Sequence, residues 1–282
     1  MDFLNFRDGG GWHRSLWAAA ALAALLAAGP TLAQQQAPML DALVESGELP
    51  PLAERLPANP LVVTPVESVG SYGGTWHSAL RGGLDNAWIA RTVAYDGLVR
   101  YDREWKTIIP NLAESWEVSD DATTYTFQLR EGLKWNNGKP FTSADIAFAV
   151  ELFSEPSYGV GTFIKNPNNK VSVEVVDDTT FKLVFAKPNG VIMDELASVN
   201  GLTLVSLSKD YCSQFYPKYN ENAAADAKAA GFETWELYMQ DRCGWATETI
   251  RWANPELPFM NAWMVDEPLT GDATRVTFKR NP

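Results

Sequence analysis

Alternating apolar and polar residues in the middle of this 282-residue chain constrain its fold more than any other feature. In residues 124–130 every second side chain is apolar, which is typical of a strand with one buried face. The pattern returns in residues 171–175 and 181–185, and Asp177 lies in the polar stretch between them. Two alternating runs around a turn predict a β-hairpin. The middle of the chain is therefore expected to be rich in β-structure.

A helix is expected between the first strand and the hairpin. Residues 133–135 are expected to continue that strand, and residues 136–138 (Asn-Asn-Gly) predict a tight turn because both residue types tolerate a positive φ. Thr142 or Ser143 is suited to cap the helix that follows, with Asp145 in its first turn. The apolar residues that fall on one helical face are Ile146, Val150 and Phe153. This face is expected to be part of the core.

The N-terminal third carries weaker patterns. A glutamine run and several prolines in residues 34–60 predict an exposed lead-in with one short helix at residues 39–46. Strand-like sequence begins at residues 61–63, and glycines then lead to an expected core strand at residues 75–80.

Further elements are expected on both sides of the hairpin. Asp85 is suited to cap a helix over residues 85–95 that packs on the sheet. Residues 202–207 form an apolar run of strand length, and residues 209–243 predict two helical pieces separated at Gly231. Residues 275–280 alternate again and predict a last strand.

The first 33 residues have the organisation of a secretory signal peptide. Arg7 and Arg14 precede an uncharged stretch, residues 16–28, and small residues lead to Ala33. A membrane anchor is the alternative, but spanning a bilayer takes about 20 apolar residues and this stretch is shorter. We expect cleavage after Ala33 and a periplasmic product that does not insert into the membrane.

Charge and composition exclude several functions. The net charge of -12 is the wrong sign for nucleic acid or anionic lipid. Two cysteines and two histidines are too few for a zinc ribbon or an iron-sulfur site, so we expect no metal and no cofactor. An oxidising compartment favours a disulfide between Cys212 and Cys243. The alternative is two unrelated cysteines, one of them buried as a small apolar residue.

A series of motifs resembles a known family. It consists of residues 95–99 (YDGLV), residues 110–119 (PNLAESWEVS) and residues 124–146 (TYTFQLREGLKWNNGKPFTSADI). The series closely resembles the extracellular solute-binding proteins of family 5, which serve peptide, nickel and oligosaccharide ABC importers. The resemblance covers about 50 residues.

The resemblance implies a fold and a domain organisation. The fold is expected to be α/β, a lobe of the periplasmic binding protein type II (cluster C) with an inserted β-rich subdomain. Residues 61–96 and 191–282 would form this lobe and residues 97–190 the inserted subdomain. Residues 275–282 resemble a strand that leads into an Arg-Asn-Pro-x-Tyr hinge motif, so we expect that the chain is truncated and lacks the second lobe. A single lobe would bind ligand weakly, because half of the ligand's burial and polar partners are lost.

Candidate ligand contacts lie after the first expected core strand: Trp76, Asp85, Asn86 and Trp88. Aromatic side chains supply stacking area, and polar side chains match buried polar groups of a ligand. Simpler interpretations are that Asp85 caps a helix and that Trp88 is a core residue. The YDGLV segment and Trp135 are interpreted as structural. Residues 261–263 (Asn-Ala-Trp) depart from the Gly-Thr-Gly-Pro-Tyr-like stretch of shorter family members.

The sequence therefore predicts the substrate-binding component of an ABC importer, with no catalytic residues. It would capture a peptide in the periplasm, deliver it to the permease subunits and act as a monomer. An oligosaccharide is the alternative ligand. A secreted glycoside hydrolase is the alternative from another class, since two carboxylates suffice for that chemistry. No pair of acids stands out by its spacing, however, and the Gly-x-Ser-x-Gly motif of serine hydrolases is absent from the sequence.

Overall fold

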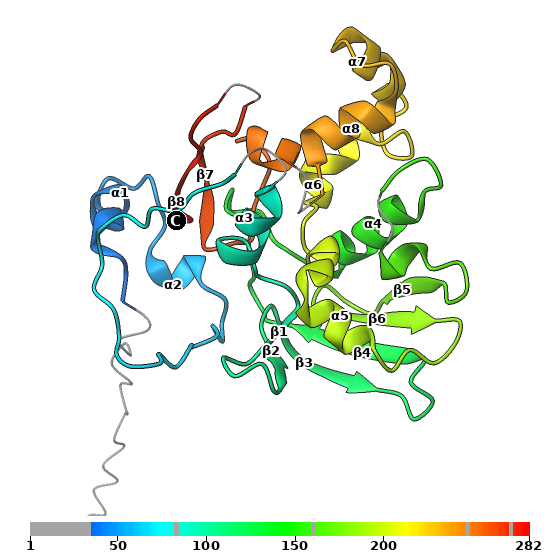
Figure 1. The fold of residues 1–282 in the computed structure, drawn as a ribbon, viewed down its shortest axis with the longest axis horizontal. Helices are drawn as coiled ribbons and strands as arrows, with labels where there is room; N and C mark the ends of the chain where they lie inside the picture. Colours follow the sequence, from blue (N-terminus) through cyan, green and yellow to red (C-terminus); the bar gives the residue numbers. More distant parts are fainter. Residues whose placement is uncertain (1–34, 82–84, 160–161, 246–248, 271–272) are drawn as a thin grey trace, which may run out of the picture. The chain divides into compact units, whose positions relative to one another are not determined.

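A four-stranded antiparallel sheet holds the alternating segments (Figure 1). The computed structural model describes residues 35–81, 85–159, 162–245, 249–270 and 273–282, so the predicted signal peptide lies outside the described residues. The strand order is β3-β4-β6-β5, with the bounds Ala113–Val118 (β3), Thr124–Leu129 (β4), Val171–Val175 (β5) and Thr180–Phe185 (β6). Burial alternates along β4 and β6, which confirms the predicted strand and hairpin.

The strand does not continue through residues 133–135, so this prediction is wrong. β4 ends at Leu129, and Gly132 follows with a φ of +81°, a conformation that favours glycine and turns the chain. Lys134 makes only an isolated bridge to Pro140 around the predicted turn. Two smaller antiparallel pairs complete the β-structure: β1 (Val99–Tyr101) with β2 (Ile108–Pro110), and β7 (Trp263–Glu267) with β8 (Thr277–Arg280). The predicted last strand is therefore present as β8.

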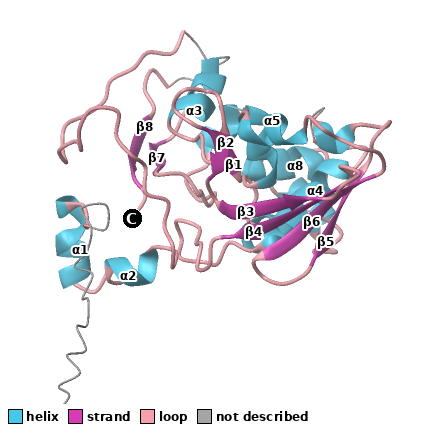
Figure 2. Cartoon of the chain, turned by 90° about the horizontal axis from the view of Figure 1, so that it is seen from below, coloured by secondary structure: helices cyan, strands magenta, loops and turns pink. Residues whose placement is uncertain are grey.

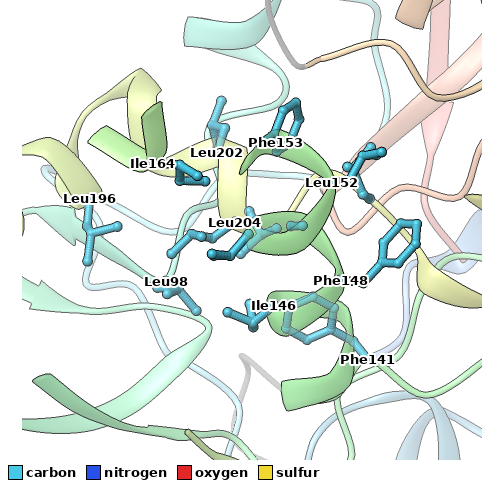
Figure 3. Packing of buried hydrophobic residues seen from close by; sticks show 14 of the residues in the cluster. Leu98, Phe141, Ile146, Phe148, Leu152, Phe153, Ile164, Leu196, Leu202 and Leu204 are labelled. Atoms are coloured by element: carbon cyan, nitrogen blue, oxygen red, sulfur yellow. The ribbon is translucent and has the colours of Figure 1, made fainter. Parts of the chain in front are cut away.

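Helix α4 (Ser143–Ser154) packs against the sheet (Figures 1 and 2). Thr142, one of the two caps that the sequence predicts, is its N-cap, and Asp145 lies in the first turn as expected. The two residues form a capping box. The Ser143 N–H donates to the Asp178 carbonyl at 2.9 Å, which connects the helix to the β5–β6 turn. Figure 3 shows buried side chains of α4 among apolar residues from distant parts of the chain. The labelled residues outside α4 are Leu98, Phe141, Ile164, Leu196, Leu202 and Leu204.

Asp145 stabilises the start of two helices at once. Its carboxylate accepts the Thr142 N–H at the start of α4 and the Lys209 N–H at the start of α6 (Lys209–Cys212), both at 2.8 Å. Burial raises the pKa of the Asp145 carboxyl, and these two donors oppose the shift. Asp145→Ala leaves two N–H groups without their acceptor, so we expect a loss of about 1 to 3 kcal/mol in the free energy of unfolding. Urea unfolding measures this loss.

Asp145→Asn is the matched control for this change. The amide keeps one oxygen acceptor, so we expect Asp145→Asn to lie between the wild-type chain and Asp145→Ala in stability. Equal stability of Asp145→Ala and the wild-type chain would contradict the double capping role.

The apolar run at residues 202–207 is not a strand, so that prediction is wrong. Helix α5 (Ile192–Ala197) is followed by a 3-10 helix, η5 (Val199–Leu204), which Ser198 caps through its side chain. A Cβ on Gly201 would lie 2.0 Å from the Leu196 carbonyl oxygen, so the close approach of η5 to α5 requires glycine. A short apolar run that is buried on all sides is compatible with either helix or strand, and its packing decides.

Four short helices follow, and a disulfide joins the first of them to the last. They are α6, η6 (Ser213–Phe215), α7 (Ala223–Ala229) and α8 (Trp235–Cys243). Gly231, with a φ of +91°, separates α7 from α8 as predicted. Cys212 at the end of α6 is disulfide-bonded to Cys243 at the end of α8, with Cα atoms 6.1 Å apart. The pair that the sequence predicts is therefore present.

The N-terminal segment contains helices but none of its expected strands. Its helices are η2 (Pro38–Leu40), α1 (Asp41–Glu45), α2 (Leu52–Arg55) and α3 (Asn86–Thr92), so the short helix of the lead-in is confirmed. Residues 61–63 and 75–80 are irregular and largely exposed, which contradicts the two predicted strands. A strand requires partners for its N–H and C=O groups, and no described strand pairs with either segment. Two 3-10 turns, η4 (Phe163–Lys165) and η7 (Thr249–Ala253), complete the described elements.

Candidate functional site

The largest cavity described has a volume of about 850 Å³. It brings together four parts of the chain: the lead-in at residues 48–63, the segment around β1 and β2, the turn at residues 130–138, and the residues that flank β7 and β8. A volume of this size is typical of pockets that hold small ligands. The groups that line it decide which ligands fit.

Asn111 and Arg130 form a hydrogen-bonded wall of this cavity. The Asn111 amide donates to the Gly97 carbonyl at 2.8 Å. The guanidinium of Arg130, which is 7% exposed, donates to the Asn111 carbonyl and to the Asn59 carbonyl, both at 2.6 Å. The second contact connects the lead-in to the end of β4. Arg130 is thus a buried cation that donates to neutral carbonyls.

The segment before β7 forms a second wall of the cavity and is fixed by amide contacts. The Asn281 N–H donates to the Ala262 carbonyl at 2.9 Å, and the Asn281 side chain donates to the Asn261 carbonyl at 2.8 Å. Asn136 exchanges hydrogen bonds with the backbone of Phe259, at 3.0 Å and 2.8 Å. The 136–138 turn is therefore held against the residues that enter β7.

Asp96 connects the two walls. Burial raises the pKa of the Asp96 carboxyl, whereas the charge of Arg100 and hydrogen bonds from the Asn111 side chain and the Ala262 backbone oppose this shift. Asp96 accepts the N–H of Ala262, and the carbonyl of the same residue accepts the N–H of Asn281. Arg100, Asp96 and the end of β8 are consequently neighbours around residue 262.

Arg280 lines the cavity and lies over two aromatic rings. Its guanidinium carbon is 5.4 Å from the Tyr72 ring centroid and 5.5 Å from the Trp263 ring centroid. Trp263 is the cross-strand partner of Arg280 in the β7–β8 pair. The rings attract the cation and remove water from its faces.

The described side chains that the sequence predicts as ligand contacts lie outside this cavity. Trp76 is 67% exposed on the irregular segment, and Trp88 is 45% exposed, so the interpretation of Trp88 as a core residue is wrong. On α3 the adjacent Ile89 and Ala90 are buried in its place. Trp76, Asp85 and Trp88 do not line the cavity, whereas the side chain of Asn86 lies outside the described part of the chain. The part of all four residues in ligand binding stays a prediction.

Asp85 occupies the N-cap position of α3 without capping it through its side chain. Its carboxylate instead accepts the Arg81 N–H at 3.1 Å. Asp96, Asn111 and Arg130 were not predicted as site residues; Asp96 belongs to the YDGLV segment, which is interpreted as structural. The available signal was a single acid, Asp96, inside an otherwise apolar motif.

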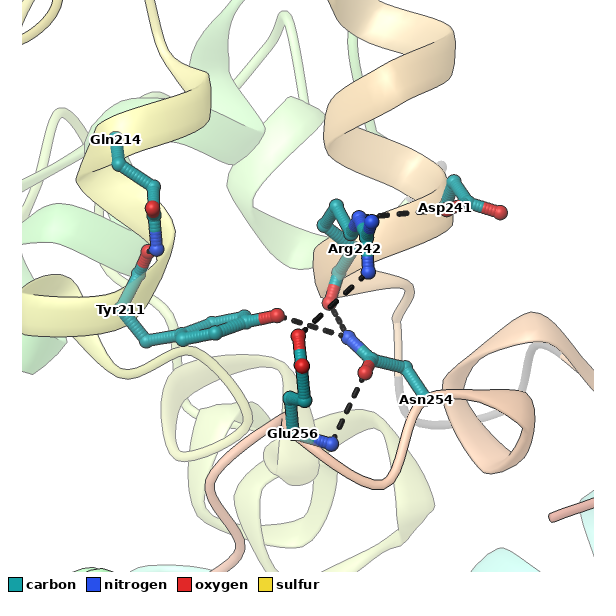
Figure 4. A network of polar contacts seen from close by, with 6 residues as sticks. All are labelled: Tyr211, Gln214, Asp241, Arg242, Asn254 and Glu256. Carbon is teal, nitrogen blue, oxygen red and sulfur yellow. Dashed lines mark hydrogen bonds and ion pairs between the residues drawn. The ribbon is translucent and has the colours of Figure 1, made fainter. Parts of the chain in front are cut away.

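A second polar cluster lies outside the large cavity and includes the residues that precede the two bonded cysteines (Figure 4). The Asn254 amide donates to the Tyr211 hydroxyl at 3.0 Å and to the Arg242 carbonyl at 2.8 Å. Arg242 lies 3.7 Å from carboxylates of both Asp241 and Glu256. Tyr211 and Arg242 directly precede Cys212 and Cys243, so this cluster reinforces the same α6–α8 junction.

The described part of the chain holds neither a candidate metal site nor a helix that could span a membrane. No group of three or more His, Cys, Asp or Glu residues is placed to hold a metal ion there. Among the helices that the structure describes, none has the length and hydropathy required to cross a membrane.

Amide, carboxylate and guanidinium groups converge around the cavity, and such groups suit a polar solute. This site is typical of the class of solute-binding proteins. The fold agrees with this class. An oligopeptide-binding protein, OppA, superposes with a TM-score of 0.76 at 33% identity, covering 88% of this chain and 37% of OppA. The fold is that of part of a lobe of a type II periplasmic binding protein.

The sequence comparisons specify the family. The model of the bacterial extracellular solute-binding proteins, family 5 Middle, matches residues 107–238. Over these residues the chain matches family 5 of the bacterial extracellular solute-binding proteins, the family that its motifs indicate.

Two curated relatives show how far the similarity extends. A putative ABC transporter peptide-binding protein of Brucella ovis is 30% identical over 186 residues, 66% of this chain and 31% of its own length. Heme-binding protein A of Haemophilus influenzae is 31% identical over 144 residues, 45% of this chain and 24% of its own length. The chain thus spans about a third or less of these relatives. The family and its similar structures are binding proteins rather than enzymes.

Proposed function

We propose that this chain provides a ligand-binding lobe of the substrate-binding component of an ABC importer, which captures a peptide for the permease. The observation that carries the proposal is the match to OppA, which extends over 88% of the chain at 33% identity. The match to the Brucella peptide-binding protein, over 66% of the chain, supports the same ligand class. The haem-binding relative matches over 45%.

The cavity suits a peptide for a physical reason. A peptide presents alternating N–H and C=O groups, which need fixed partners when water is removed from them. Asn111, Asn261 and Asn281 supply amide groups, and Asp96 supplies a carboxylate, on two walls of the cavity. Such partners fix the orientation of the peptide backbone and leave the choice of peptide side chains broad.

The remaining parts of the proposal concern location and organisation. The leader at residues 1–33 would direct the chain to the periplasm, where it would work with permease subunits as a monomer. We further propose that residues 61–96 and 191–282 form the lobe and that residues 97–190 form an inserted subdomain. The disulfide between Cys212 and Cys243 is in keeping with an oxidising compartment.

Nuclear magnetic resonance of the ¹⁵N-labelled chain, residues 34–282, tests the ligand class. Millimolar di- to pentapeptides are expected to shift the amide signals of Asn111, Asn261 and Asn281, whereas oligosaccharides leave them unchanged. The peptides are expected to be recovered intact by mass spectrometry. Shifts caused by oligosaccharides alone, or cleavage of the peptides, would contradict the proposal.

A further inference from the structure

The charge around the large cavity is opposite to the charge of the chain. The chain carries a net charge of -12, yet five cations and three acids line this cavity. The cations are Arg55, Arg100, Arg130, Lys134 and Arg280, and the acids are Glu48, Glu54 and Asp96. Glu48, Glu54 and Lys134 are exposed, so one acid, Asp96, and four cations of this set are at least partly buried. A local excess of cations in a low-dielectric wall attracts an anionic group.

These five cations do not form ion pairs with carboxylates among the described residues. The cations that do so lie outside the cavity: Lys106, Lys182, Lys218, Arg242, Arg275 and Lys279. Arg55, Arg130 and Lys134 are engaged by carbonyl oxygens, since Arg55 donates to Pro282 and Lys134 donates to Glu54. Arg100 and Arg280 are left as the cations of the cavity with the greatest capacity for a further acceptor.

Arg280 is prepared for an anion by its surroundings. Its Nε–H is buried and has no acceptor in the part of the chain that the structure describes. The Tyr72 and Trp263 rings flank the guanidinium and leave its in-plane donors as the hydrogen-bonding edge. A planar guanidinium matches the two oxygens of a carboxylate, and a buried donor without an acceptor is costly until one binds.

Arg100 lines the same cavity as Arg280. It acts on the Asp96 carboxyl, which accepts the Ala262 N–H, and the Ala262 carbonyl accepts the N–H of Asn281, the residue after Arg280. Two arginines from segments about 180 positions apart therefore contribute to one cavity.

We propose that Arg100 and Arg280 bind a carboxylate group of the transported solute, with Arg130 adding buried positive charge behind them. The assignment rests on the proposed function, because it takes the cavity as the site of the solute. It narrows the ligand class to solutes with a free carboxylate, which is either the C-terminus of a peptide or an acidic side chain.

The test follows the arginine Nε–Hε signals and the dissociation constant by nuclear magnetic resonance. Three ligands share one neutral tripeptide sequence: the free acid, the C-terminal amide, and an amide with glutamate at one position. The free acid is expected to bind at least tenfold more tightly than the neutral amide and to shift the Arg100 and Arg280 signals. Rescue by the glutamate amide would assign the site to a side chain, and no rescue to the C-terminus. Raising the salt concentration from about 50 to about 500 mM is expected to weaken the binding of the free acid, because salt screens the attraction between two charges.

Variants locate the contact. Arg100→Gln and Arg280→Gln are each expected to remove most of the difference between the free acid and the amide. Arg280→Lys keeps the charge but not the planar fork of donors, so this variant is expected to retain part of the difference in binding between the free acid and the amide. Arg103→Gln is the matched control, because Arg103 is an exposed cation just beyond β1 and outside the cavity. Far-ultraviolet circular dichroism checks that each variant is folded.

Acetate and acetamide separate this inference from the proposed function. Acetate is expected to shift the Arg100 and Arg280 signals and acetamide is not. Shifts with acetate but with no peptide would keep the carboxylate site and reject the peptide ligand. Equal binding of free acid and amide, with arginine signals that do not respond to acetate, would overturn the carboxylate site and leave peptide binding intact.

Discussion

Replacing Phe127 with alanine is expected to lower the free energy of unfolding by about 3 to 5 kcal/mol. Phe127 is fully buried in the middle of β4 and stacks on Phe181 of β6, its cross-strand partner, with ring centroids 5.4 Å apart. Alanine removes the apolar area of the ring and leaves a space that neighbouring strands cannot close, because both are fixed in the ladder. Urea or thermal unfolding followed by circular dichroism measures the loss.

Thr126→Ala is the matched control on the same strand. Thr126 points to the opposite face of the sheet and is only partly buried, so we expect its loss to cost less than about 1 kcal/mol. If the two variants lost similar stability, the assignment of the buried face of the sheet would be wrong.

Removing the disulfide is expected to have an effect of similar size. The double change Cys212→Ala and Cys243→Ala opens a link between residues 31 positions apart, for which the loop-entropy relation predicts a loss of about 3 to 4 kcal/mol. The Tyr211, Asn254 and Arg242 contacts hold the same junction (Figure 4), so the native structure is expected to persist without the covalent link. Unfolding in urea, with and without the two changes, measures the effect.

Accessibility provides an independent check of the same bond. Both cysteines are fully buried, so dithiothreitol is expected to leave the folded chain oxidised and to reduce it only in denaturant. Counting free thiols after each treatment measures this difference. Rapid reduction of the folded chain would show that the α6–α8 junction opens in solution. Unchanged stability of the double variant would mean that the polar cluster alone holds it.

Local signals in the sequence determined the sheet and the helix against it. The period of two in residues 124–130 and 181–185 marks one buried face whatever surrounds it, and β4 and β6 follow that pattern. The capping contacts between Thr142 and Asp145 lie within the first turn of α4, so the start of α4 can be predicted from sequence, whereas the contact of Asp145 with Lys209 depends on the tertiary structure. The two cysteines and the expected compartment were likewise sufficient to predict the disulfide. The motif series identified the family.

Contacts between distant residues decided the rest. Residues 75–80 have a strand-like composition, but a strand exists only where another strand supplies hydrogen-bond partners, and no described strand does so there. Residues 202–207 are apolar throughout, and the approach of Gly201 to Leu196 selects a 3-10 helix. Arg280 gains its environment from Tyr72, more than 200 positions earlier, and from its strand partner Trp263. Sequence patterns report periodicity and local caps, whereas a cavity depends on which distant side chains the tertiary structure brings together.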